Sequence, residues 1–118
     1  MSPPRSASKL SLQDRVLDDT CLVAIAGEFD LLTAPEVRGR LEDLIDKGQS
    51  DLIVDLSAVN FMDSSGLAVL LDVWHTLGAR RGVFRVVCPP GPVRATLEIT
   101  GLDEALPLHL TREEALSR

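Results

Sequence analysis

The sequence predicts a single α/β domain built on a small, mostly parallel sheet of four to five strands. The first observation is that apolar, strand-like runs alternate with amphipathic, helix-like runs from Thr20 onward. The second is that strands joined by helices pair in parallel through right-handed crossovers. The third is size, since 118 residues, 45% of them hydrophobic, suffice for one domain with a single core. No internal repeat or second domain is visible in the sequence.

The first nine residues carry no folding signal. Residues 1–9 are rich in Ser and Pro, which bury too little apolar area to offset the entropy of ordering. We therefore expect a disordered leader, followed by a folded domain at 10–118. Neither a secretory leader nor a membrane-spanning run is recognisable, and this implies a cytoplasmic, reduced environment. Cys21 and Cys88 lie in separate apolar runs, as buried free thiols do.

The strands are read from the apolar runs. Residues Leu10–Leu17 predict an antiparallel edge strand that turns near Asp18-Asp19. Thr20–Ala26 is a continuous apolar run, typical of a strand covered on both faces, and Gly27–Asp30 ends it. Ser57–Asn60 is expected to be a turn in which Ser57 forms a local hydrogen bond. Further extended segments are expected at Asp51–Leu56, Val83–Cys88 and Leu106–Leu110.

Helix signals occupy the segments between these strands. Thr33 can cap a helix, Glu36 can reach back to the backbone N–H of that cap, and Pro35 stands where no donor is needed. This helix carries an apolar stripe on one face and ends at Gly48. The remaining expected helices begin at Ser65, ending within 78–82, at Val93, ending before Gly101, and after a second capping box at Thr111–Glu114.

Charge and composition exclude several classes of function. The net charge of -6 disfavours binding to a nucleic-acid backbone and suits a partner with a basic face. Three Phe, one Trp and no Tyr supply too few aromatic rings for base stacking. No metal-binding cluster, nucleotide-binding loop or hydrolase elbow motif is present, so we expect no metal, no cofactor and no enzymatic activity. A serine hydrolase would need His75 or His109 within hydrogen-bond reach of Ser65.

The most informative segment lies where a buried strand gives way to the helix that starts at Ser65. Asp63 or Ser64 is the natural N-cap, whereas Ser65 has no capping role and is expected to point outward. Gly66 adds no bulk and would keep the surface open to a partner. Because parallel strands end at one edge of a sheet, the loop that carries Asp30 should lie nearby. A phosphate is tolerated at such a helix start, since N–H groups and the helix dipole favour an anion.

Six short segments together form a family signature: Gly27-Glu28-Phe29-Asp30, Thr33-Ala34, Asp55-Leu56-Ser57, Phe61-Met62-Asp63-Ser64-Ser65-Gly66-Leu67, Cys88-Pro89-Pro90-Gly91-Pro92-Val93 and Leu97 with Gly101-Leu102. Through them the chain resembles a STAS domain of the anti-sigma factor antagonist type, from about Leu10 to Leu116. In that family an anti-sigma factor is also a serine kinase and phosphorylates the serine before the glycine, which is Ser65 here.

The resemblance implies a mechanism. The unmodified protein would bind the anti-sigma factor and free a sigma factor, phosphorylation of Ser65 would end that binding, and a separate phosphatase would restore it. Asp30 would either face the nucleotide of the kinase or orient the Ser65 hydroxyl. The alternative is a STAS module of a larger signalling assembly or a small-ligand sensor. An enlarged apolar pocket near the Gly27 and Ser65 loops would favour ligand sensing. The residues expected to contact the partner are Asp30, Thr33, Asp63, Ser64, Ser65, Gly66 and Leu67.

Overall fold

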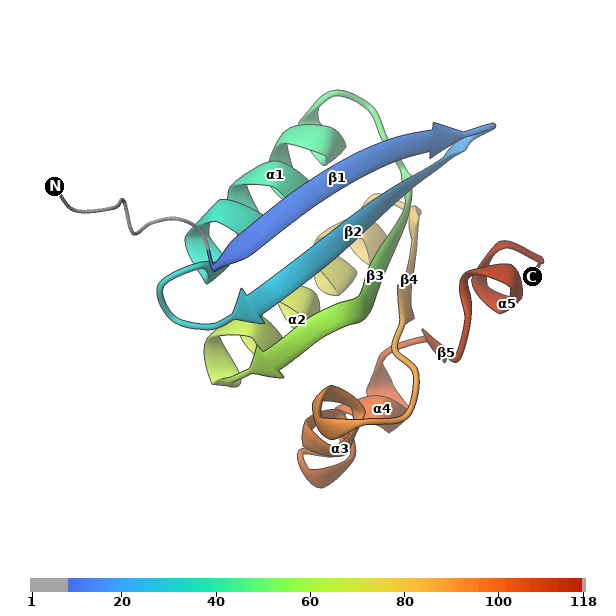
Figure 1. Cartoon of the computed structure of the whole chain (residues 1–118). Helices are drawn as coiled ribbons and strands as arrows, with labels where there is room; N and C mark the ends of the chain where they lie inside the picture. Colours follow the sequence, from blue (N-terminus) through green and yellow to red (C-terminus); the bar gives the residue numbers. More distant parts are fainter. Residues whose placement is uncertain (1–8, 118) are drawn as a thin grey trace, which may run out of the picture.

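The computed structural model describes residues 9–117 and contains one five-stranded sheet (Figure 1). The strand order is β1-β2-β3-β4-β5, with β1 antiparallel to β2 and all other pairs parallel, which confirms the predicted α/β class and its antiparallel edge. In chain order the elements are β1 (Leu10–Leu17), β2 (Thr20–Phe29), α1 (Ala34–Asp46), β3 (Asp51–Met62), α2 (Ser64–Ala79), β4 (Val83–Val87), α3 (Pro92–Ile99), α4 (Leu102–Ala105), β5 (Leu108–His109) and α5 (Arg112–Ser117).

The predicted disordered leader, residues 1–9, lies outside the described residues except for Lys9. The carbonyl of Lys9 accepts a hydrogen bond from the Glu28 backbone N–H at 2.7 Å, so this residue is fixed against β2. Gly27 lies at the same place with a φ of +107°, and a Cβ there would come within 2.1 Å of the Lys9 carbonyl oxygen. Glycine is therefore required at position 27 by both backbone conformation and close approach.

The two faces of the sheet are covered differently. Figure 1 shows α1 and α2 side by side along one face, where the apolar stripes of both helices close the main core. On the opposite face the short helix α5 contributes Ala115 to a smaller cluster with Leu22, Ile53 and Val87. Cys21 and Cys88 are buried free thiols, and burial raises the pKa of Cys88 to about 11. None of the helices between residues 9 and 117 combines the length and apolar character needed to cross a bilayer.

Charged side chains attach α5 to the sheet. The buried Arg85 donates hydrogen bonds to the Ala115 carbonyl and to Asp51. Arg112 donates through Nε to the buried Asp55, and the Ser57 hydroxyl donates to the same carboxylate at 2.6 Å. The predicted local hydrogen bond of Ser57 is thus confirmed.

Strands β2 and β3 are longer than predicted, because both continue past the residues at which they were expected to end. β2 continues through Gly27 to Phe29, and β3 continues through residues 57–60, which were expected to form a turn. The pairing of β2 with β3 shifts register between Ala24 and Ala26 and again between Gly27 and Glu28. These irregularities break the alternation of buried and exposed side chains, which is why the segment resembled a turn in the sequence. The short helix α4 was not predicted, because four residues carry no periodic pattern.

The capping predictions had different outcomes. Thr33 is the N-cap residue of α1, but its side chain makes no cap hydrogen bond, because its backbone is already helical and its hydroxyl turns back toward β2. The expected capping box there is wrong. At α5 the Thr111 hydroxyl accepts the Glu114 backbone N–H at 3.1 Å, which confirms the cap, while the Glu114 carboxylate accepts from Leu110 instead of the cap residue.

Candidate functional site

The carboxyl ends of β2 and β3 bring two loops together at one edge of the sheet. The Asp63 backbone N–H donates to the Phe29 carbonyl at 3.4 Å, and the Leu31 backbone N–H donates to Asp63 Oδ2 at 3.2 Å. The loop that carries Asp30 therefore lies against the start of α2, as the parallel topology predicted.

Asp63, and not Ser64, is the N-cap of α2. Its Oδ1 accepts the Ser65 backbone N–H at 2.8 Å, so one carboxylate serves the first turn of α2 and the neighbouring loop at once. Ser64 is exposed at the first helical position. A carboxylate in this place is stabilised by the free N–H groups and the dipole of the helix.

Asp30 and Thr33 organise the loop before α1. Asp30 Oδ1 accepts the backbone N–H groups of Leu32 at 3.0 Å and of Thr33 at 3.2 Å. The Thr33 hydroxyl donates to the Glu28 carbonyl at 2.7 Å and accepts from the Asp30 backbone N–H at 2.9 Å. Within residues 9–117 neither side chain forms a hydrogen bond with Ser65. Their first role is therefore to hold the loop in shape, and Asp30 does not orient the Ser65 hydroxyl.

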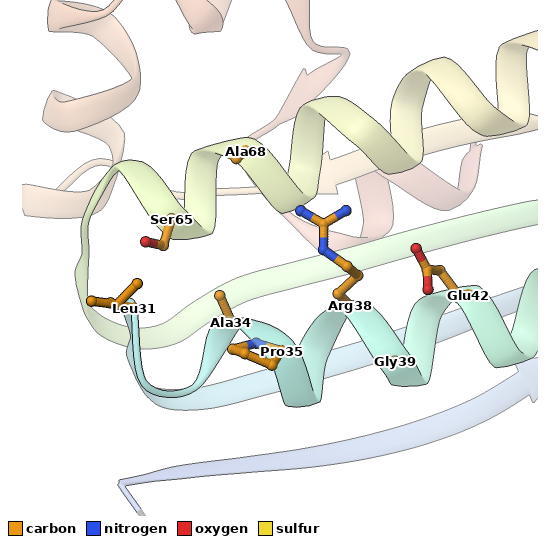
Figure 2. A pocket seen from close by; sticks show the side chains of 8 residues that line it. All are labelled: Leu31, Ala34, Pro35, Arg38, Gly39, Glu42, Ser65 and Ala68. Atoms are coloured by element: carbon orange, nitrogen blue, oxygen red, sulfur yellow. The ribbon is translucent and has the colours of Figure 1, made fainter.

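Ser65 lies in a groove between α1 and α2. The groove has a volume of about 390 Å³, and Figure 2 shows the Ser65 hydroxyl at the end nearest Leu31. Ser65 is partly exposed, and its hydroxyl has no hydrogen-bond partner in the described part of the chain. A free, reachable hydroxyl is what a phosphoryl transfer needs. The groove is lined by Leu31, Ala34, Pro35, Arg38, Gly39, Glu42, Ser65 and Ala68.

Gly66 and Leu67 face the interior. Both are buried, and a Cβ on Gly66 would come within 2.7 Å of Met62 Cγ and 2.9 Å of the Phe29 carbonyl oxygen. The expectation that Gly66 keeps the surface open is wrong, because its missing side chain lets α2 approach the ends of β2 and β3. These two residues shape the site from below and are not part of its accessible surface.

Exposed apolar side chains border the site. Leu31 is 71% exposed and Leu32 is 83% exposed, both in the loop that Asp63 holds. Phe61, at the end of β3, is 52% exposed, whereas Met62 beside it is buried. The two leucines were not among the residues predicted to contact a partner, although adjacent leucines between a strand end and a helix cap are a visible signal in the sequence. Exposed apolar side chains gathered in one place are typical of a protein-docking surface.

Neither histidine supports a serine hydrolase. His75 is exposed and stacks on Trp74, and it lies ten residues beyond Ser65 on α2, about 15 Å along the helix axis. His109 lies in the edge strand β5, which β3 and β4 separate from β2. No group of side chains suited to a metal ion occurs among residues 9–117.

Comparison with known proteins gives a consistent assignment. The STAS domain family matches residues 11–115. A relative, the anti-sigma-F factor antagonist RsfB of Mycobacterium tuberculosis, is 31% identical over 96 residues, which cover 81% of this chain and 78% of RsfB.

Solved structures extend the likeness to the fold. An anti-sigma factor antagonist from Mycobacterium paratuberculosis has a TM-score of 0.86 and 32% identity, covering 99% of this chain and 97% of that one. The Bacillus cell fate determinant SpoIIAA, solved in its phosphorylated form, has a TM-score of 0.70 and 26% identity, covering 92% of this chain and 98% of that one.

Proposed function

The chain belongs to the STAS domain family, and on this basis we propose that it is an anti-sigma factor antagonist switched off by phosphorylation of Ser65. The unmodified protein binds an anti-sigma factor with serine kinase activity and thereby frees a sigma factor in the cytoplasm. The single observation that supports the choice of residue is the unpartnered, partly exposed Ser65 hydroxyl beside exposed leucines.

The modification is an ordinary phosphoryl transfer. The Ser65 oxygen forms a bond to the γ-phosphorus of ATP, the bond from that phosphorus to the β,γ-bridging oxygen breaks, and ADP leaves. The hydroxyl proton passes to a base on the kinase. A phosphatase then hydrolyses the phosphoserine and restores the hydroxyl. This chain supplies the acceptor and the docking surface, and it performs no catalysis.

The negative charge of the phosphate explains why phosphorylation of Ser65 would end partner binding. Phosphate adds about 1.5–2 negative charges at pH 7, close to the Asp63 carboxylate that accepts the Ser65 backbone N–H. The fold tolerates this charge at the start of α2, because the free N–H groups and the dipole of the helix favour an anion there. The relative SpoIIAA keeps a similar fold in its phosphorylated form. The interface does not tolerate it, because an unpaired charge buried in a contact costs about 3–5 kcal/mol. That cost corresponds to a loss of affinity of roughly 10²–10³·⁵.

A small-ligand sensor fits the groove less well. The residues that line it include Leu31, which is 71% exposed, and the charged Arg38 and Glu42. A small molecule there would be covered from one side, whereas ligand sites in proteins commonly bury about 70–90% of a ligand.

The test combines phosphorylation with binding. Incubation with candidate anti-sigma kinases and ATP, followed by mass spectrometry, should place one phosphate on Ser65 and leave the adjacent, exposed Ser64 unmodified. Ser65→Ala should bind the kinase and accept no phosphate, and Ser65→Asp should bind poorly. Ser64→Ala is the matched control and should behave like the natural chain. Full phosphorylation of Ser65→Ala on this loop would overturn the proposal.

A further inference from the structure

Arg38 shares its groove with Ser65. Arg38 extends from α1 toward α2, where its Nη1 lies 2.7 Å from Asp72 Oδ2, and Figure 2 shows its guanidinium beside Ala68. It is the one basic side chain that lines this groove in the described part of the chain.

The side chains of α2 that face Arg38 form a continuous stripe. Ser65, Ala68 and Asp72 are spaced three and four residues apart, so they lie on one face of the helix. Ala68, with its small side chain, lies between Asp72 and Ser65 along this stripe, and both Ala68 and Ser65 line the groove together with Arg38. A guanidinium bound to Asp72 can therefore turn toward Ser65 by rotation about its own side-chain bonds.

The existing ion pair is easily exchanged. The side chains of Arg38 and Asp72 are 36% and 56% exposed, and exposed pairs of this kind add little to stability. Phosphate offers about two charges and three acceptor oxygens where Asp72 offers one charge and two oxygens. Guanidinium groups bind phosphate through two parallel hydrogen bonds, which favours the exchange.

We infer that Arg38 is a phosphoserine latch: when Ser65 is phosphorylated, the guanidinium leaves Asp72 and pairs with the phosphate across the groove. The inference rests on the proposed function only for the source of the phosphate. Among the residues that line the groove, the only other charged side chain in the described part of the chain is acidic, and the basic Lys9 at the end of β2 already lies 3.8 Å from Glu28. Glu42 lines the far part of the groove, and the Asp30 and Asp63 carboxylates accept backbone N–H groups. Arg38 is thus the cation that holds the phosphate of Ser65 close to α1 and offsets part of its negative charge.

The latch has a functional consequence. A phosphate paired with Arg38 is held toward the groove between α1 and α2, where a phosphatase reaches it less easily. Because one guanidinium offsets only about one of its two charges, the remaining charge still opposes partner binding. The phosphorylated state then persists longer than it would with an exposed phosphate. Removal of Arg38 should leave the switch intact but speed the hydrolysis of the phosphoserine.

The test uses the full chain with phosphoserine installed at position 65 during synthesis, so it requires neither a kinase nor a partner. Phosphorus NMR follows the second ionisation of the phosphate, which in free phosphoserine has a pKa of about 6. The pKa should be lower in the natural sequence than in Arg38→Gln by about one pH unit. Arg40→Gln is the matched control, because Arg40 lies on the same helix but pairs with Asp14, and it should leave the titration unchanged.

A second measurement needs no substitution. The side-chain N–H signals of Arg38 should shift and exchange more slowly with water after phosphorylation, while those of Arg40 should not change. Equal phosphate titration in the natural chain and in Arg38→Gln, or an unchanged Arg38 signal, would overturn the latch. Because the phosphate is already in place, either result would leave the proposed antagonist function standing, and absence of a partner kinase would not affect the latch.

Discussion

Asp63 and Leu31 are joined across the edge of the sheet: Asp63 Oδ2 accepts the Leu31 backbone N–H at 3.2 Å. The other oxygen of the same carboxylate accepts the Ser65 backbone N–H at 2.8 Å. One side chain therefore positions both the loop with the exposed leucines and the helix turn with the candidate phosphoacceptor. The loop with the exposed leucines and the candidate phosphoacceptor are thus coupled through Asp63.

Asp63→Ala should lower the free energy of unfolding by about 1–2 kcal/mol, because it removes an N-cap and leaves the loop N–H unpaired. Asp63→Asn should cost less, since asparagine caps helices about as well as aspartate. Urea unfolding measures both. Asp72→Ala is the control, because it removes a carboxylate from an exposed pair on the same helix. If Asp63→Ala were no more destabilising than Asp72→Ala, the coupling would be wrong.

Gly66→Ala should destabilise the fold by about 1–3 kcal/mol, because the added methyl would overlap Met62 and the Phe29 carbonyl. Gly39→Ala, within α1, should be neutral or stabilising by up to about 1 kcal/mol, since a Cβ there meets nothing within 4 Å. Thermal unfolding of the two variants compares the change in stability at Gly66, which is needed for packing, with the change at Gly39, which is not. A stable Gly66→Ala would contradict the close approach of α2 to the strand ends.

Leu32→Ser should weaken binding of the anti-sigma partner at least tenfold, equivalent to about 1.4 kcal/mol, without changing stability by more than about 0.5 kcal/mol. The reason is that Leu32 is 83% exposed in the loop that Asp63 holds and has little packing to lose. Val16→Ser is the control, since Val16 is 60% exposed but pairs with Cys21 at the opposite end of β2. Calorimetry with both variants decides whether the leucine loop is the docking surface.

Stability should fall in acid through Asp55. Burial alone raises the pKa of Asp55, but hydrogen bonds from Ser57 and Arg112 outweigh it and hold the pKa below its ordinary value. A lowered folded-state pKa contributes stability above the unfolded value of about 3.9, and this contribution is lost as pH falls through the folded-state pKa.

The variant that tests this is Arg112→Gln. It should lose about 1–3 kcal/mol at pH 7 and show a smaller further loss between pH 5 and pH 2, because the hydrogen bond to the charged carboxylate is gone. Urea midpoints across that range measure the effect. Arg38→Gln is the control, since its partner Asp72 is exposed. Parallel acid curves for Arg112→Gln and the natural chain would contradict the role of this pair.

Patterns local in the sequence predicted most of the fold. The alternation of apolar and amphipathic runs, the hairpin turn and the helix start after Asp63 depend on neighbouring residues, and all three are confirmed. The errors fall where the pattern is interrupted. Two register shifts between β2 and β3 concealed the length of β3, and a hydroxyl turned back to Glu28 cancelled the expected cap at Thr33.

The candidate site likewise has some features that local sequence patterns predict and others that they do not. A serine with no capping role at the start of a helix, after a buried strand, is visible in the sequence, because strand, cap and helix patterns each need only a few adjacent residues. The hydrogen bond of Leu31 to Asp63, the inward position of Gly66 and the contact of Arg38 with Asp72 became visible only in the folded chain. Those contacts join residues about thirty positions apart or depend on how closely a helix approaches the sheet, and no local pattern encodes such distances.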